Sequence, residues 1–237
     1  MPKNQTHTYT SVTGECVMTF DKEGRTTVFT GYAGDAVVNG NSNGIDLFGF
    51  GTGNITFFAN GGDNRAFGAG GNDFFKGGSN GTNHFDGGAG DDVEIAGGWQ
   101  STLNGGAGSD TLIGNGEYSE LNGDAGNDHL LLAGLYTNAS GGEGADRFSI
   151  APTPWGWVGN SSIQDFNPKE GDILDLSMLK GVTQNNLSVH GDTLEVHIPY
   201  GGTVSVYGVV HEIVLMGVAN AIQNGNLVLP WGFDAKG

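Results

Sequence analysis

The chain has 237 residues, enough for one elongated domain with a sizeable core, although only 37% of them are hydrophobic. Glycine occurs 45 times, far above its usual share of about 7%, so the chain is either disordered or needs glycine at fixed places. The formal net charge of −17 argues against binding to nucleic acid, anionic membranes or polyanionic glycans, and the single cysteine excludes an internal disulfide framework.

Residues 1–30 predict N-terminal capping strands. Residues 16–20 and 26–30 are short runs rich in β-formers on either side of the turn-forming residues 21–24, a pattern typical of a hairpin. The first fourteen residues lack the apolar segment of a cleavable signal peptide, and no run of about 18 apolar residues predicts a membrane span.

Residues 68–150 contain a repeat with a fixed period. Five segments fit the pattern Gly-Gly-x-Gly-x-Asp-x-U-x, in which U is an apolar residue. The last four recur with a constant 18-residue period, and the first lies one position further away than this period: residues 68–73, 87–92, 105–110, 123–128 and 141–146. Such a period indicates a solenoid rather than disorder.

Two apolar columns alternate through this repeat. The U column consists of Phe75, Glu94, Leu112, Leu130 and Phe148, and the second column consists of Phe85, Leu103, Leu121 and Ala139. A tight turn followed by a short strand fills each half of the period, and the strands of successive coils stack about 4.8 Å apart. We therefore predict an all-β, right-handed parallel β-roll or β-helix with 18-residue turns.

Residues 31–67 carry a degraded form of the same repeat. The two inward columns extend backwards as Val38, Phe48, Phe57 and Phe67. Ala36 and Ile55 stand where the repeat has Asp, so these β-helix turns are expected to be poor in calcium.

Glu94 is the exception in the U column. Its neighbours Val93 and Ile95 are both apolar, so we expect a local flip of the strand that buries them and exposes Glu94. The alternative is a buried carboxylate with a raised pKa.

The repeated Asp residues carry the predicted chemistry. A carboxylate and several turn carbonyls offer the hard oxygen ligands that calcium prefers, and stacked turns can share an ion. Five such turns predict about four or more Ca²⁺ ions. The predicted ligand residues are Asp73, Asp92, Asp110, Asp128, Asp146, Gly71, Gly88, Gly90, Gly106, Gly108, Gly126, Gly142 and Gly144. A metal-free glycine-rich solenoid is the alternative.

The turns at the opposite edge of the coil carry different residues. At the position equivalent to the repeated Asp they have Asp46, Arg65, Asn83, Ser101, Ser119 and Thr137. Only Asp46 could be an anionic ligand, so this edge is expected to lack calcium and to depend on short polar side chains.

Residues 151–237 predict a β-rich C-terminal cap. A loop containing Pro and Trp ends the repeat at residues 151–157. Strands are expected at residues 162–166, 171–177, 187–189, 193–198 and 203–207, with a turn at 199–202 between the last two.

Three motifs near the end of the repeat resemble the segment that closes the β-roll of RTX, or haemolysin-type, proteins. They are Gly-Ala-Asp-x-Phe at 144–148, Ile-x-Asp-Phe at 163–166 and Gly-Asp-x-Leu-Asp-Leu-Ser at 171–177. The resemblance implies export through a type I channel, an uncleaved secretion signal within residues 151–237, and a contribution of Asp165 to the last calcium site.

The expected function is therefore that of a secreted protein that folds on binding extracellular calcium. No His-Glu-x-x-His motif occurs, which favours a non-enzymatic adhesive, matrix or surface-interaction role. The alternative is a solenoid that binds or modifies a polysaccharide, and Trp99, Tyr118 and His129 are its candidate residues.

Overall fold

The computed structural model describes residues 11–13, 16–20, 26–30, 34–40, 42–153, 156–179, 182, 186–190, 193–198, 201–208 and 227–228. Within these residues the chain is almost entirely β, and no α-helix occurs. The predicted hairpin turn at 21–24 and the end of the tail at 229–237 lie outside the described residues. The secretion signal expected within residues 151–237 stays a prediction.

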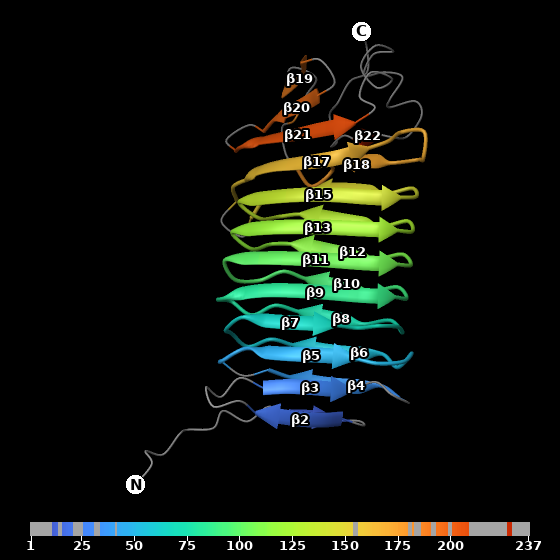
Figure 1. Cartoon of the computed structure of the whole chain (residues 1–237). Helices are drawn as coiled ribbons and strands as arrows, with labels where there is room; N and C mark the ends of the chain where they lie inside the picture. The colour runs from blue at the N-terminus through green and yellow to red at the C-terminus, as the bar shows by residue number, and fades with distance from the viewer. Residues whose placement is uncertain are drawn as a thin grey trace.

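The strands form two sheets that face each other along one long axis (Figure 1). Sheet A has ten strands in the order β1 (Ser11–Thr13), β4 (Ala36–Asn39), β6 (Ile55–Phe58), β8 (Phe74–Lys76), β10 (Val93–Ile95), β12 (Thr111–Gly114), β14 (His129–Leu132), β16 (Arg147–Ile150), β18 (Ile173–Asp175) and β22 (Leu227–Val228). Sheet B has twelve strands in the order β19 (Leu187–His190), β20 (Thr193–His197), β21 (Thr203–Gly208), β17 (Asn160–Phe166), β15 (Tyr136–Glu143), β13 (Tyr118–Ala125), β11 (Gln100–Ala107), β9 (Thr82–Ala89), β7 (Asn64–Phe67), β5 (Ile45–Gly49), β3 (Thr26–Thr30) and β2 (Cys16–Phe20).

The chain alternates between the two sheets, so each coil contributes one strand to each. In sheet B, Phe85 pairs with Leu103 and Leu103 pairs with Leu121, each one full repeat further along the chain in a parallel register. Figure 1 shows the strands stacked as the rungs of one column. The predicted parallel β-solenoid with 18-residue turns is confirmed.

Antiparallel strands lie at both ends of the parallel stack. The expected N-terminal hairpin is present, because β2 pairs antiparallel with β3. However, β3 also pairs in parallel with β5, so the coil begins at residue 26 rather than near residue 31. At the other end, β21 pairs in parallel with β17 and antiparallel with β20, as expected for a β-rich cap.

The predicted apolar columns form the core. Phe75, Leu112, Leu130 and Phe148 from sheet A face Phe85, Leu103, Leu121 and Ala139 from sheet B, and all are buried. Val38 and Phe57 extend the core towards the N-terminus as predicted.

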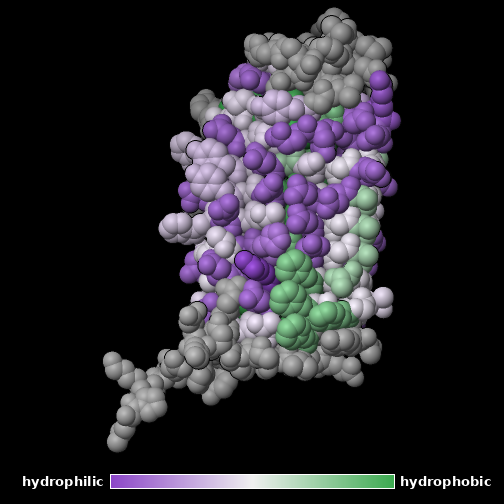
Figure 2. Space-filling model, in the orientation of Figure 1, coloured by the Kyte–Doolittle hydropathy of each residue, from purple (hydrophilic) through white to green (hydrophobic). Residues whose placement is uncertain are grey.

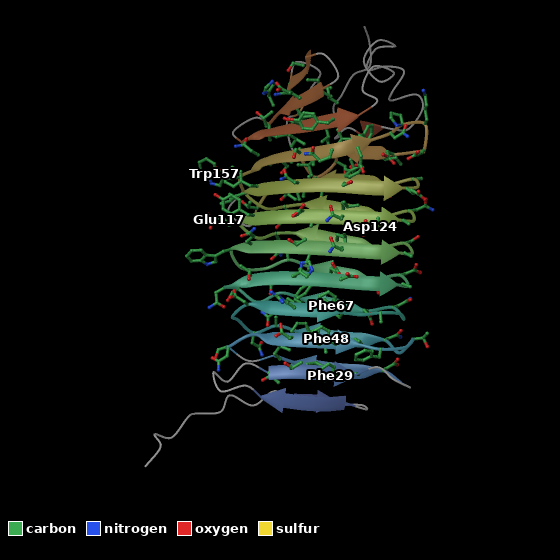
Figure 3. The ribbon with its side chains drawn as sticks, viewed as in Figure 1. Phe29, Phe48, Phe67, Glu117, Asp124 and Trp157 are labelled. Carbon is green, nitrogen blue, oxygen red and sulfur yellow. The ribbon has the colours of Figure 1, made fainter. Side chains whose placement is uncertain are left out.

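The predicted inward positions of Phe48 and Phe67 are wrong. Leu47 and Ala66 point into the core instead, because the partner of Phe85 is Ala66, one position further back than Phe67, and the partner of Ala66 is Leu47. The two Phe side chains lie on the outer face of sheet B, where Phe29, Phe48 and Phe67 form a stack with ring centroids 5.5 and 5.4 Å apart (Figure 3).

The same one-residue shift applies to the polar column predicted for the turns of the opposite edge. Asp46 and Arg65, which were predicted to belong to this column, pair with each other on the outer face of sheet B. Ile45 and Asn64 occupy the two positions in the column instead. Asn64 then donates to Asn83, and Asn83 donates to Ser101, so short polar side chains link these three turns. The buried hydroxyls of Ser119 and Thr137 have no hydrogen bond within the described residues.

The expected outward flip of Glu94 is also wrong. Glu94 is fully buried, whereas Val93 and Ile95 are partly exposed. Glu94 pairs with Phe75 on one side and Leu112 on the other, and both partners face inward. A flip would require β10 to slip against both neighbouring strands, and that would cost the ladder hydrogen bonds of three strands.

Candidate metal centre

The predicted calcium turns form one edge of the solenoid, where each strand of sheet B leads into the next strand of sheet A. We call this the Asp edge and the opposite edge the second edge. All eight predicted glycines have positive φ angles, between 95° and 150°: Gly71, Gly88, Gly90, Gly106, Gly108, Gly126, Gly142 and Gly144. Glycine is favoured there because this region is sterically unfavourable for other residues.

Five aspartates form a column along the Asp edge, each one residue before a strand of sheet A. Asp73, Asp92, Asp110, Asp128 and Asp146 are each only 1–2% exposed. We call these five residues the Asp column. The structure therefore brings together the five carboxylates that the repeat predicted.

One oxygen of each carboxylate in the column links two turns. The Oδ1 atom of Asp92 accepts the backbone N–H of Asp73 at 2.6 Å, and Oδ1 of Asp110 accepts that of Asp92 at 2.7 Å. The same contact continues through Asp128 and Asp146, at 2.8 and 2.9 Å. A continuous ladder thus satisfies a backbone donor in each of these turns.

The other oxygen of each carboxylate is buried without a partner. The Oδ2 atoms of all five members of the column have no hydrogen bond within the described residues. The first glycine of each motif makes room for this atom: a Cβ on Gly105 would lie 2.3 Å from Oδ2 of Asp110, and one on Gly123 would lie 2.3 Å from Oδ2 of Asp128. A buried acceptor without a donor is costly unless a proton or a cation neutralises it.

The pKa values of the column show this cost. Burial, and to a smaller extent the neighbouring carboxylate of Asp92, raises the pKa of Asp73 to about 7 against the lowering effect of the Ile55 N–H. Burial likewise raises the pKa of Asp92 to about 6 and that of Asp128 to about 7. The pKa values of Asp110 and Asp146 are raised for the same main reason. In the metal-free protein the surroundings of the column therefore disfavour the ionised form of these carboxyl groups.

Asp172 continues the column, although it was not among the predicted ligands. Its Oδ1 accepts the N–H of Asp146 at 2.9 Å, and its Oδ2 accepts the N–H of Asn167 at 2.7 Å. Burial raises its pKa to about 6. The signal was present, because Leu174 follows Asp172 at the spacing of the repeat, but the spacing of 26 residues from Asp146 hid it.

Asp165, which was expected to contribute to the last calcium site, lies in β17, the strand of sheet B that follows the last repeat. Its carboxylate accepts the N–H groups of Gly141 and Gly142, each at 3.0 Å, and the hydroxyl of Ser140. This carboxylate is therefore close to the turn that carries Asp146, but its oxygens are already hydrogen-bonded.

A second ladder lies outside the Asp column, one residue earlier in each turn. Oδ1 of Asn72 accepts the N–H of Asp91 at 3.0 Å, and Oδ1 of Asp91 accepts that of Ser109 at 2.8 Å. Asn127 contacts Ala145 in the same way, at 2.8 Å. The two ladders run in opposite directions along the chain, and the exposed one was not predicted because its residues vary from turn to turn.

The donor set of the Asp edge fits calcium better than a transition metal. In the described residues no three His, Cys, Asp or Glu side chains converge in a group that could hold a metal ion. A site that takes one carboxylate per turn and completes its shell with carbonyls would not form such a group, and oxygen-only shells of this kind suit calcium. The five unpartnered Oδ2 atoms offer one free carboxylate oxygen per turn, which fits such a site.

The candidate glycan residues do not form one site. Trp99 and Tyr118 are exposed at the second edge. His129 lies on the outer face of sheet A, where its Nε2 atom is 2.9 Å from the Ser149 hydroxyl. Burial, and next the Arg147 charge, lower the pKa of His129.

Comparisons with known proteins add no family to this description. No family model, curated protein or solved structure matches the chain. The fold and the Asp edge therefore define a parallel β-solenoid with a column of buried aspartates. Among the described residues, no helix is long and apolar enough to cross a membrane.

Proposed function

We propose that the chain is a secreted, calcium-binding β-roll protein of the RTX type, in which the Asp edge binds several Ca²⁺ ions. The observation that carries the proposal is the row of five buried Oδ2 atoms without hydrogen bonds. Asp73, Asp92, Asp110, Asp128 and Asp146 would supply the carboxylates, with carbonyls of the glycine turns completing the shells.

Calcium binding and folding are expected to be coupled. Without a cation, stacked carboxylates repel one another and must also be buried. When bound, calcium supplies the positive charge that removes both costs. Extracellular calcium modules have dissociation constants of about 10⁻⁴–10⁻³ M, so millimolar calcium contributes about 0.4–1.4 kcal/mol per site. Several sites together would approach the stability of a whole domain.

This coupling suits a protein that leaves the cell unfolded. Calcium is scarce in the cytosol and abundant outside, so the chain would fold after export. A non-enzymatic adhesive, matrix or surface-interaction role follows best, because the acidic residues of the Asp edge serve folding rather than catalysis.

A calcium titration tests the proposal. EDTA-treated protein is titrated with calcium while far-UV circular dichroism and urea unfolding are followed, for the wild type and for Asp110→Asn. The Asn side chain keeps an oxygen for the N–H of Asp92 but lacks the charge. We expect the variant to be more stable than the wild type in EDTA and to gain less stability from calcium.

Asp63→Asn is the matched control. Asp63 lies at the second edge, where its Oδ1 accepts the N–H of Thr82 at 2.9 Å, a turn-to-turn contact of the same kind. This variant should respond to calcium like the wild type. A wild-type protein whose stability is the same in EDTA and in millimolar calcium would leave a metal-independent solenoid and end the proposal.

A further inference from the structure

The second edge carries a row of exposed aromatic side chains. Eight large hydrophobic side chains are exposed in the described part of the chain, and four of them lie on this edge. Trp99 and Trp157 are 68% and 63% exposed, and Tyr118 and Tyr136 are 51% and 46% exposed. Figure 2 shows pale, weakly polar side chains projecting from this edge, at the left of the view. Contiguous exposed apolar surface of this kind is typical of binding sites.

One member of this row, Trp99, lines a groove of about 520 Å³. Besides Trp99, Ile95 and Leu135 add apolar surface to the lining. Glycines from three successive coils also line it: Gly77, Gly78, Gly97, Gly98 and Gly116. Because glycine has no side chain, a ligand can approach the backbone closely here.

Backbone hydrogen bonds between successive turns fix the shape of the groove. The N–H of Trp99 donates to Gly81 O at 3.1 Å, and the N–H of Tyr118 donates to Trp99 O at 2.9 Å. Gly98 has a φ of +72°, and a Cβ there would lie 2.4 Å from Gly81 O. The turns are therefore close-packed, and a ligand would meet a preformed site, which lowers the entropic cost of binding.

The polar groups of the groove are few and balanced. Lys76 and Glu117 contribute one charge of each sign, and Asn115 contributes an amide. Figure 3 shows Glu117 on the same edge as Trp157. A concave, largely apolar surface with a few hydrogen-bonding groups is typical of a small-molecule site, and the net charge of −17 opposes a polyanionic ligand.

We infer that this groove binds an uncharged glycan. The C–H groups of a sugar ring carry partial positive charge and suit the negative face of the Trp99 indole, while its hydroxyls can bond to Lys76, Asn115 and Glu117. Tyr118 and Tyr136, stacked with centroids 4.9 Å apart, extend the contact surface along the axis to further sugar units. The site lies opposite the Asp edge and goes beyond the proposed calcium binding.

Isothermal titration calorimetry of the full chain in calcium tests the inference. The probes are neutral hexasaccharides of glucose, xylose, mannose and N-acetylglucosamine, with an oligogalacturonate as the polyanionic comparison. At least one neutral probe should bind with millimolar or better affinity. Trp99→Ala should weaken this binding about tenfold or more, and Trp99→Phe should give an intermediate value.

Tyr207→Ala removes an exposed aromatic ring outside the groove and serves as the control, with unchanged affinity expected. Circular dichroism of each variant checks that the fold is retained, as expected for exposed positions. The inference is overturned if no neutral probe binds, if only the polyanion binds, or if Trp99→Ala binds like the wild type. None of these outcomes depends on which ion occupies the Asp edge, provided that the protein is folded.

Discussion

Each carboxylate of the Asp column has two different environments at its two oxygens. In Asp110, Oδ1 accepts the N–H of Asp92, whereas Oδ2 is buried without a hydrogen bond in the described residues. The residue therefore joins two turns and destabilises them at the same time. A cation beside Oδ2 would remove the cost and leave the turn-to-turn contact intact.

Glu94 presents a cost of a different kind, inside the core. Its two carboxyl oxygens are buried and have no hydrogen bond in the described part of the chain. Burial, together with the nearby charge of Asp92, raises its pKa well above the usual range. We expect Glu94→Leu to raise the free energy of unfolding by about 2–4 kcal/mol at neutral pH, because leucine matches the apolar column.

Urea unfolding measures this change, and Glu120→Leu is the control. Glu120 is exposed on the outer face of sheet B, so its replacement should change stability by less than about 0.5 kcal/mol. A Glu94→Leu variant less stable than the wild type would show that the carboxyl makes a favourable interaction in the core.

The residues whose conformation is set within one turn were predictable. The positive φ angles of Gly90, Gly108 and Gly144 follow from their place in the motif, because few other residues adopt that backbone region. The orientation of Glu94 was not predictable from its polarity, because the strands on either side of β10 determine which way it faces.

At the scale of the element, the turns of the Asp edge depend on glycines that touch the next coil. A Cβ on Gly123 would lie 2.3 Å from Oδ2 of Asp128 and 2.5 Å from Gly141 O. The backbone atom cannot move aside without disturbing the stack. Gly123→Ala should therefore lower the free energy of unfolding by about 1–3 kcal/mol or more, in calcium and in EDTA.

Gly34→Ala is the matched control for urea unfolding, because nothing lies within 4 Å of a Cβ at this position. Its stability should stay within about 0.5 kcal/mol of the wild type. Equal effects of the two substitutions would mean that the close approach at Gly123 does not limit the packing of these turns.

Coil length separates the correct predictions from the errors. Where coils keep the regular period of the repeat, as in β9 to β15, counting along the chain located every inward residue except the orientation of Glu94. The longer spacing from Ala66 to Phe85 displaced Phe67, and with it Phe48, by one position, which in a strand means the opposite face. Asp172 was missed because a loop lengthens the step from Asp146.

At the scale of the whole molecule, the metal-free protein should become less stable as pH rises. In the folded state the pKa values of Asp73 and Asp128 are about 7 and that of Asp92 is about 6, whereas an unfolded Asp titrates near about 3.9. Between about pH 4 and 7 the folded state therefore binds more protons, so the free energy of unfolding falls as pH increases. This contribution is complete below about pH 4 and lost above about pH 7.

Urea unfolding at about pH 5 and pH 8 checks this expectation, in EDTA and in millimolar calcium. Calcium should remove or reverse the dependence, since the ion replaces the proton beside the carboxylates. A metal-free protein that gains stability steadily with pH across this interval would contradict the raised pKa values of the Asp column.

The identical registers of β9, β11, β13 and β15 give the molecule a natural unit of length. Each of these strands has eight residues, and each meets its neighbour one repeat later through the same pairing. Duplicating or deleting one complete coil would leave every remaining coil with the same kind of neighbour above and below. An insertion of half a coil would instead carry aspartates to the second edge and interrupt the aromatic row. Tandem duplication of the coding sequence for one coil would therefore lengthen the solenoid by a whole coil without requiring a new interface between coils.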